Sequence, residues 1–191
     1  MGTQYKSYHH FKGDNLTPSE KVERKIVELL LNSKIPDRKR ESSIVFELKH
    51  SSECVQVARI IAQKRNLDIS LAESIAALHD IYVIVNGTYK EHAKLGALIT
   101  KKIMIEIGGF SDKEISIVSN AVAHHSEKDV YTDNPYIELI KDADVFACSL
   151  YKNAEDEYRL SKSELLFQEY SNRVKKVRKE LGLNPNQVWR K

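Results

Sequence analysis

The sequence predicts an all-α fold, a helical bundle with a metal site in its core. Apolar residues recur at three- and four-residue steps along most of the 191-residue chain, and helix-start signals precede these segments. Alternation of apolar and polar residues, the pattern of a strand, is nearly absent. Histidines and aspartates fall among the apolar positions of several predicted helices, where they could meet in the interior as metal ligands.

Length and composition fit one globular domain. The chain is 41% hydrophobic and 30% charged, and 30 basic against 27 acidic residues leave a net charge of only +3. Such a balance disfavours nucleic acid as the main partner. Two cysteines are too few for a disulfide framework or a cysteine-based zinc site. No stretch has the expected pattern of a signal peptide or a bilayer span, so we expect a cytoplasmic protein without membrane contact.

We divide the chain into a flexible N-terminal segment, 1–16, a helical domain, 17–160, and a peripheral C-terminal helix with its tail, 161–191. His9 and His10 fall in the first segment, outside the pattern developed below. The basic runs at 34–40 and 173–179 are typical of solvated helix ends or linkers. The sequence leaves the oligomeric state open.

The first two helices are predicted at 17–32 and 44–64. Thr17 and Glu20 have the spacing of a capping box, with proline at the first helical position. In the second helix, His50 shares one face with apolar residues and so points toward the core.

A short third helix should end at the His79-Asp80 doublet. Ser70 and Glu73 have the spacing of a capping box at its start. A loop containing Asn86-Gly87 is expected to follow the doublet.

Two further helices carry more histidines. The first, at about 89–107, has His92 on its apolar face, and the second begins at a capping box of Ser111 and Glu114 and ends near His124-His125. Because these last two histidines are adjacent on a helix, their directions differ by about 100°.

The C-terminal part contains two more predicted helices. Asn134-Pro135 starts one in which Asp144 falls in an apolar stripe. The last, at 161–181, begins at another Ser-x-x-Glu start and has a sparse apolar face that includes Leu165.

The joint pattern of histidines and aspartates favours a metal site. Each residue alone is more often a hydrogen-bonded core residue or a cap, but burying all of them without partners would cost several kcal/mol for each charged group. One or two divalent transition metal ions, such as iron, manganese or zinc, would offset that cost, and histidine-rich ligation argues against a purely Mg²⁺-selective site. The predicted ligands are His50, His79, Asp80, His92, His124, His125 and Asp144.

Five segments between about 48 and 150 resemble, in order and spacing, the HD-domain metal-dependent phosphohydrolases. The segments are 50–58, 77–81 around the doublet, 92–97, 121–126 and 143–146. The resemblance implies an HD-domain-like helical bundle.

The same resemblance implies roles for the site residues. A first metal would be held by His50, His79, Asp80 and Asp144. Asp80 would bridge to a second metal bound by His92 and His125, and Asp80 is also the predicted catalytic residue. Some branches of the family also use the residue at the His124 position. Asp142 competes with Asp144, which is preferred because it shares the apolar stripe of the helix.

One departure from the family pattern concerns contact with substrate. Many members place a lysine that can approach phosphate where this chain has Val83, and the Gly-Tyr-Pro motif of the cyclic-dinucleotide branch is absent after His124-His125. Lys90 and Lys128 are the alternative residues for phosphate binding, with Arg59 a weaker third.

The predicted function is hydrolysis of a phosphate ester or anhydride. The substrate would be a small phosphorylated molecule, in the first place a nucleotide, attacked by hydroxide formed at the metal. Two alternatives stay open: a non-catalytic sensor that binds metal or nucleotide, and a di-iron oxygenase.

Overall fold

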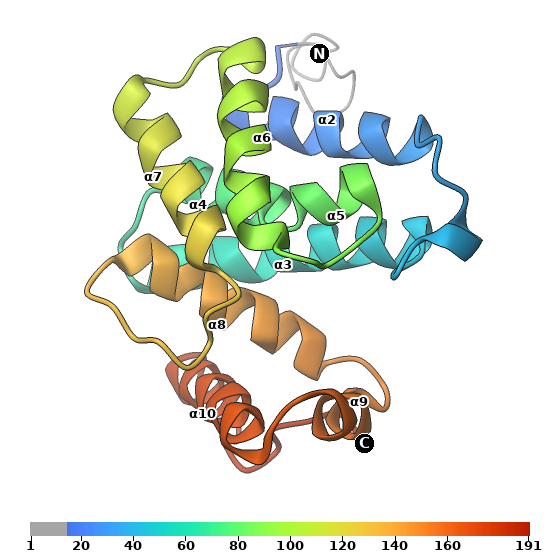
Figure 1. The fold of residues 1–191 in the computed structure, drawn as a ribbon. Coiled ribbons are helices and arrows are strands. Elements are labelled where there is room, and N and C mark those ends of the chain that lie inside the picture. Colours follow the sequence, from blue (N-terminus) through green and yellow to red (C-terminus); the bar gives the residue numbers. More distant parts are fainter. Residues whose placement is uncertain (1–14) are drawn as a thin grey trace, which may run out of the picture.

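The computed structural model describes residues 15–191, and all regular secondary structure in that range is helical (Figure 1). The all-α prediction is confirmed. His9, His10 and most of the segment 1–16 lie outside the described residues. The helices are α2 Pro18–Leu31, α3 Ile44–Lys64, α4 Ile69–Leu78, α5 Ile81–Asn86, α6 His92–Ile107, α7 Asp112–His124, α8 Pro135–Ser149, α9 Ala154–Ser161 and α10 Glu164–Glu180, with one 3-10 turn, η2, at Asp37–Lys39.

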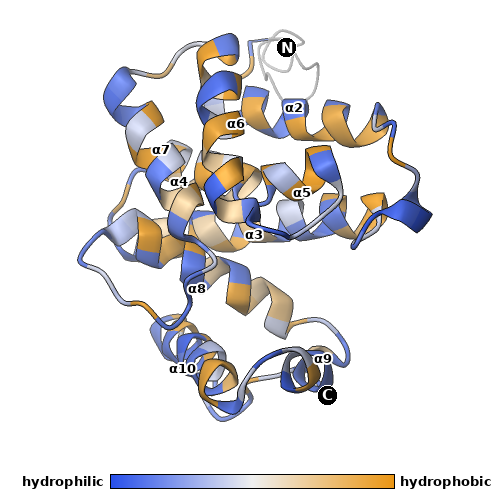
Figure 2. Cartoon of the chain, viewed as in Figure 1, coloured by the Kyte–Doolittle hydropathy of each residue, from blue (hydrophilic) through white to orange (hydrophobic). Residues whose placement is uncertain are grey.

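The helices pack around a central group formed by α3, α4 and α8. Helix α3 packs on α4 and α8, α6 packs on α5 and α7, and α10 packs on α8. Figure 1 shows α9 and α10 on the opposite side of α8 from α4, α6 and α7. Hydrophobic and hydrophilic residues alternate along the helices (Figure 2), as expected where each helix buries one face.

Three of the predicted helix starts are confirmed. Thr17 and Ser111 each complete a capping box with the glutamate three residues on. The side chain of Asn134 accepts hydrogen bonds from two backbone N–H groups in the first turn of α8.

The start of α4 differs from the prediction. Its N-cap is Asp68, whose side chain accepts a hydrogen bond from Leu71 N at 2.8 Å, so Ser70 lies inside the helix. Glu73 is buried and instead accepts hydrogen bonds from Ser19 Oγ at 2.7 Å and from Arg59 Nε at 2.5 Å. The glutamate therefore joins α4 to α2 and α3 rather than capping its own helix.

The loop predicted after the doublet is largely helical. Residues 81–86 form α5, which ends at Gly87 with φ 70°, a left-handed conformation that favours glycine. Helix α6 then begins at His92, later than predicted, because Glu91 also adopts a left-handed conformation with φ 52°. The left-handed turn at Glu91 therefore sets the start of α6 and with it the position of His92.

The C-terminal part contains one helix that the sequence did not predict, α9. Helix α10 begins after the N-cap Ser163, two residues later than predicted. Phe167 lies on its buried face, whereas Leu165, which the sequence analysis placed there, is 83% exposed.

The segment Ile69–Asn86 has the length and composition of a membrane span, with a mean hydropathy of 1.3, contrary to the expectation that no stretch would. In the structure it comprises α4 and α5, and 72% of it is buried inside the protein. Burial in the core accounts for its apolar character.

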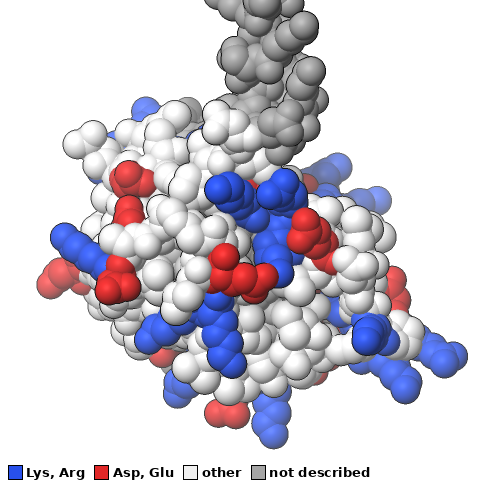
Figure 3. Space-filling view, turned by 90° about the horizontal axis from the view of Figure 1, so that it is seen from above, with Lys and Arg blue, Asp and Glu red and all other residues white. Residues whose placement is uncertain are grey.

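The basic runs are only partly solvated. Lys and Arg side chains are interspersed with Asp and Glu on the face shown in Figure 3. Contrary to expectation, however, Arg40 and Arg173 are buried. The Arg40 guanidinium donates to the carbonyls of Val83 and Ile84 at the end of α5, and Arg173 joins α10 to α8.

Gly96 marks the place where α6 packs against its neighbours. A Cβ atom at this position would lie 3.4 Å from Ile81 Cγ2 and 3.4 Å from Val122 Cγ1, which is close van der Waals contact. Helix α6, which begins with His92, therefore packs tightly against the helix that follows Asp80 and the helix that precedes His125.

Candidate metal centre

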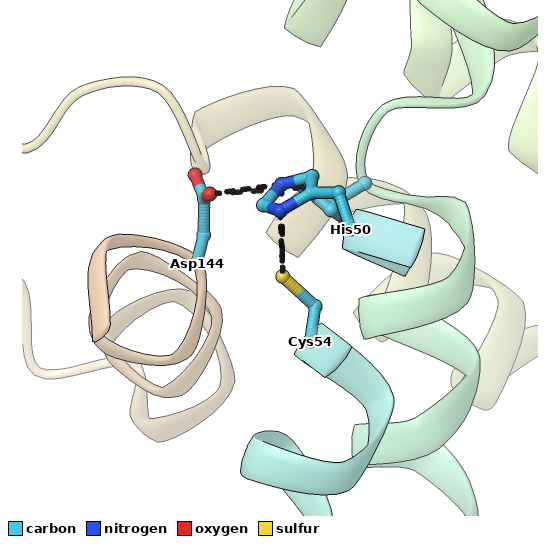
Figure 4. Close-up of side chains that lie close together, drawn as sticks. His50, Cys54 and Asp144 are labelled. Carbon is cyan, nitrogen blue, oxygen red and sulfur yellow. Dashed lines mark hydrogen bonds and ion pairs between the residues drawn. The ribbon is translucent and has the colours of Figure 1, made fainter. Parts of the chain in front are cut away.

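Helices α3, α4 and α8 bring the first group of ligand atoms together. His50 Nε2 lies 3.1 Å from His79 Nε2 and 3.2 Å from Asp144 Oδ1. Figure 4 shows His50 on α3 facing Asp144 on α8, with Cys54 one turn along α3. His50 and His79 are almost completely buried. These three residues, predicted as ligands, therefore meet in the interior.

Asp80 lies between this group and a second one. Its Oδ2 atom is 3.3 Å from His79 Nε2 and 3.8 Å from His50 Nε2. Its Oδ1 atom is 3.4 Å from both His92 Nε2 and His125 Nε2. Each carboxylate oxygen thus faces a different pair of imidazoles, which is the arrangement required of a bridging ligand.

Backbone carbonyl groups orient three of the four imidazole rings at the site, those of His79, His92 and His125. In each of them Nδ1 lies within hydrogen-bond distance of the carbonyl oxygen three residues earlier, and because a carbonyl can only accept, Nδ1 carries the hydrogen. The Nε2 lone pair therefore points into the site. The ring and carbonyl pairs are His79 with Ala76 at 2.7 Å, His92 with Tyr89 at 2.8 Å and His125 with Val122 at 2.8 Å.

The donor set fits divalent cations. Asp80 Oδ1 is buried and has no hydrogen-bond partner among the described residues. The nearest nitrogens, His92 Nε2 and His125 Nε2, are 3.1 Å apart and present lone pairs to each other. One cation would satisfy all three atoms. Within each group the ligand atoms lie within 4.8 Å of one another, the groups being His50, Cys54, His79 and Asp144, and Asp80, His92 and His125.

The protonation states of the carboxylates and of His125 suit metal binding. Burial opposes protonation of His79, but the adjacent Asp80 carboxylate raises the pKa of its imidazole, so a cation would have to displace a proton there. Burial opposes ionisation of Asp80, but the imidazoles of His79 and His125 hold its pKa well below the usual range. Burial likewise opposes ionisation of Asp144, and the Lys128 ammonium keeps its pKa well below the usual range. Burial lowers the pKa of His125 to about 4. At neutral pH the site therefore offers two carboxylates and a neutral His125.

Two of the residues weighed as ligands lie elsewhere. His124 Nδ1 pairs with Glu127 at 2.9 Å, and 43% of its side chain is exposed. Asp142 is buried in ion pairs with Arg65 at 2.6 Å and Arg173 at 2.8 Å. Helical geometry explains both positions, since each residue differs in direction from the neighbour that reaches the site.

The two lysines predicted to contact phosphate have different environments. Lys90 is exposed. Lys128 is only 2% exposed, and its Nζ lies 2.6 Å from Asp144 Oδ2 and 2.5 Å from the His125 carbonyl oxygen. Lys128 therefore belongs to the metal centre, directly behind one of its carboxylates.

Cys54 and Glu47 were not among the predicted site residues. Cys54 Sγ lies 3.7 Å from His50 Nδ1, but burial raises the pKa of the thiol to about 12, so it remains protonated. Glu47 is fully buried and accepts hydrogen bonds from Ser42 and from Tyr89 Oη. Their spacing of four and three residues from His50 on one helix was the signal available in the sequence.

The helices thus bring two groups of imidazoles and a carboxylate between them into one candidate metal centre. A family model of the HD domain matches residues 48–148, just over half of the chain. The chain therefore belongs to the HD-domain family, whose members are typically metal-dependent hydrolases that bind divalent metals. The resemblance inferred from the sequence is confirmed.

Comparison with individual proteins gives partial matches. The chain is 33% identical over 102 residues to ribonuclease Y of Chlorobium phaeobacteroides and 28% identical over 97 residues to ribonuclease Y of Chloroflexus aurantiacus. These matches cover 53% and 50% of this chain but only 18% of each relative. The chain thus spans less than a fifth of the length of these relatives.

A solved structure shows the same fold over most of the chain. The protein is described as a predicted HD superfamily hydrolase from an uncultured Thermotogales bacterium, with 17% identity and a TM-score of 0.56. The similarity covers 88% of this chain and 91% of that one. It therefore extends beyond the residues matched by the family model.

Proposed function

We propose that this protein is a metal-dependent phosphohydrolase that cleaves a phosphate ester or anhydride of a nucleotide or another small phosphorylated metabolite. The position of Asp80 carries the proposal, because its two oxygens face two separate pairs of imidazoles. Divalent cations in such a site supply Lewis-acid activation of water and of a phosphoryl oxygen. Histidine-rich ligation favours iron, manganese or zinc.

In this proposal the chain's own residues orient the ligands and determine the charge of the site. Asp80 and Asp144 contribute two negative charges, and the Lys128 ammonium, 2.6 Å from Asp144, offsets one of them. One divalent cation would give these three side chains and the metal together a net positive charge, which favours an anionic phosphate.

The two lysines would contribute to substrate binding in different ways. Lys128 uses two of its three N–H groups on His125 O and Asp144, which leaves one for a phosphate oxygen. Lys90 is exposed and precedes His92 by two residues, so it could reach a phosphate only from outside the centre.

RNA is the second substrate class to test. The curated relatives carry the name ribonuclease Y, and the matches to them cover about half of this chain, 53% and 50%. The chain's nearly balanced charge, with a net +3, favours the smaller substrate. The two proposals differ in the bond cleaved, which is a phosphate ester or anhydride of a small molecule in the first and a phosphodiester of RNA in the second.

The decisive experiment combines metal analysis with a substrate screen. Protein supplemented with manganese, iron or zinc is assayed for bound metal, for phosphate release from nucleotides and for cleavage of short single-stranded RNA. We expect bound transition metal and turnover of a nucleotide, with at least about a hundredfold loss in His79→Ala and Asp80→Ala.

His124→Ala is the matched control. Its side chain pairs with Glu127 outside the ligand groups, so activity should remain. No bound metal after supplementation, or unchanged turnover in Asp80→Ala, would contradict the proposal. Cleavage of RNA alone would move the substrate to the second class, and nucleotide binding without turnover would favour a sensor.

A further inference from the structure

A cavity lies on the far side of α8 from the candidate metal centre (Figure 1). It has a volume of about 720 Å³ and is bounded by α9, α10 and the segment 186–191. All of its lining residues follow residue 148, so they lie outside the segment matched by the family model. None of them is a predicted metal ligand.

The cavity lining is strongly basic. It contains five basic residues and one acidic residue, Glu155, which pairs with Arg159. Lys175 is exposed and makes no hydrogen bond or ion pair with the other described residues. The excess of positive charge is therefore not neutralised within the cavity. The basic residues are Arg159, Lys175, Arg178, Arg190 and Lys191.

Rigid aromatic groups and amides form the rest of the site. The ring of Trp189 stacks on the ring of Phe167, with the two ring centroids 5.6 Å apart. Trp189 Nε1 donates a hydrogen bond to Ser171 Oγ at 3.3 Å. Gln168 Nε2 donates to Glu164 and Gln187 Oε1 accepts from Arg178, which leaves Gln168 Oε1 and Gln187 Nε2 for hydrogen bonds to the edge of a base.

We propose that this cavity binds a nucleoside polyphosphate. Several cations without compensating carboxylates suit a polyphosphate, and the volume falls within the range of about 300–1,000 Å³ typical of small-molecule sites. This ligand site is separate from the metal centre and does not depend on the proposed hydrolysis.

The test is titration of the metal-free full chain with ATP, at fixed ionic strength and with excess chelator. Trp189 is the only tryptophan in the sequence and lines the cavity, so its fluorescence reports binding there directly. Calorimetry gives the stoichiometry. We expect one saturable site per chain, weaker binding of tripolyphosphate and no saturable binding of adenosine.

Lys175→Glu should weaken ATP binding by about tenfold or more, since it reverses a charge at the site. Lys179→Glu is the matched control. This residue lies one turn further along α10, is also exposed and does not line the cavity, so affinity should stay within about twofold.

Asp80→Ala, which abolishes the proposed hydrolysis, should bind ATP in this assay like the wild type. Absence of a saturable fluorescence change, or equal weakening by Lys175→Glu and Lys179→Glu, would overturn the assignment. Equal affinity for tripolyphosphate and ATP would overturn recognition of the nucleoside.

Discussion

Adjacent histidines in this protein have different roles because of a rotation of about 100° between neighbouring helical positions. His125 Nε2 lies 3.4 Å from Asp80 Oδ1, whereas His124 pairs with Glu127. We predict that His125→Ala lowers the bound metal from two ions to one, because it removes a ligand of only the second group. Elemental analysis of protein saturated with manganese or zinc measures the stoichiometry.

The comparison with His124→Ala isolates this effect. The metal stoichiometry of His124→Ala should equal that of the wild type. Asp80→Asn should reduce the metal occupancy of both ligand groups, because both groups share that carboxylate. Equal metal loss in His124→Ala and His125→Ala would show that the separation of the two histidines is wrong.

Lys128 and Lys90 permit a second comparison between single residues. Replacing Lys128 with methionine removes the buried partner of Asp144, and we predict that the metal-free protein loses about 2–4 kcal/mol of unfolding free energy. Urea denaturation with and without saturating metal measures the loss. The loss of unfolding free energy should be smaller with metal, because the metal provides Asp144 with a new partner.

Lys90→Met serves as the reference, because Lys90 is exposed and should change the unfolding free energy by no more than about 0.5 kcal/mol. A similar small effect of Lys128→Met would mean that its pairing with Asp144 contributes little to the folded state.

These residues also illustrate which parts of the site could be predicted. The positions of His50 and Asp144 followed from helical periodicity, since each lies in an apolar stripe. The burial of Lys128 could not be read from the sequence, because its partners are Asp144 on the next helix and the carbonyl of His125. Periodicity describes one helix at a time.

At the scale of elements, α10 is held to α8 by buried charges. Arg173 is fully buried and donates to Glu138 at 2.9 Å and Asp142 at 2.8 Å, as well as to the Lys128 carbonyl at 2.7 Å. We predict that Arg173→Met lowers the unfolding free energy by about 3–5 kcal/mol, because Glu138 and Asp142 lose the buried guanidinium that joins them, and Lys141 and Arg65 each pair with only one of the two. Chemical denaturation monitored by circular dichroism measures it.

Lys176 provides a control on the same helix and the same carboxylate. It pairs with Asp142 at 2.8 Å, but 47% of its side chain is exposed, so Lys176→Met should cost no more than about 1 kcal/mol. Equal losses in the two variants would argue against burial as the source of the effect.

The predicted helix starts show where sequence reasoning works for an element. The capping boxes at Thr17 and Ser111 were found because their partners are three residues away. The capping box predicted at Ser70 does not form, because Glu73 accepts a hydrogen bond from Ser19, 54 positions away in the chain. Helix α5 was missed because six residues are too few to show a 3.6-residue period.

At the scale of the molecule, the metal centre links helices that are far apart in sequence. The ligands come from α3, α6 and α8 and from the ends of α4 and α7, so a cation bound by them contacts most of the bundle at once. We predict that chelation lowers the thermal midpoint and that added manganese or zinc restores it in a concentration-dependent way. A ligand that binds only the folded state stabilises it by about 4 kcal/mol at a thousand times its dissociation constant.

Differential scanning calorimetry over a metal series measures the shift of the thermal midpoint. Asp80→Ala should show little or no shift, because that variant lacks the ligand shared by both groups. If the wild type and Asp80→Ala shift equally, the stabilising metal binds outside the centre, and the assignment of these residues as its ligands is wrong.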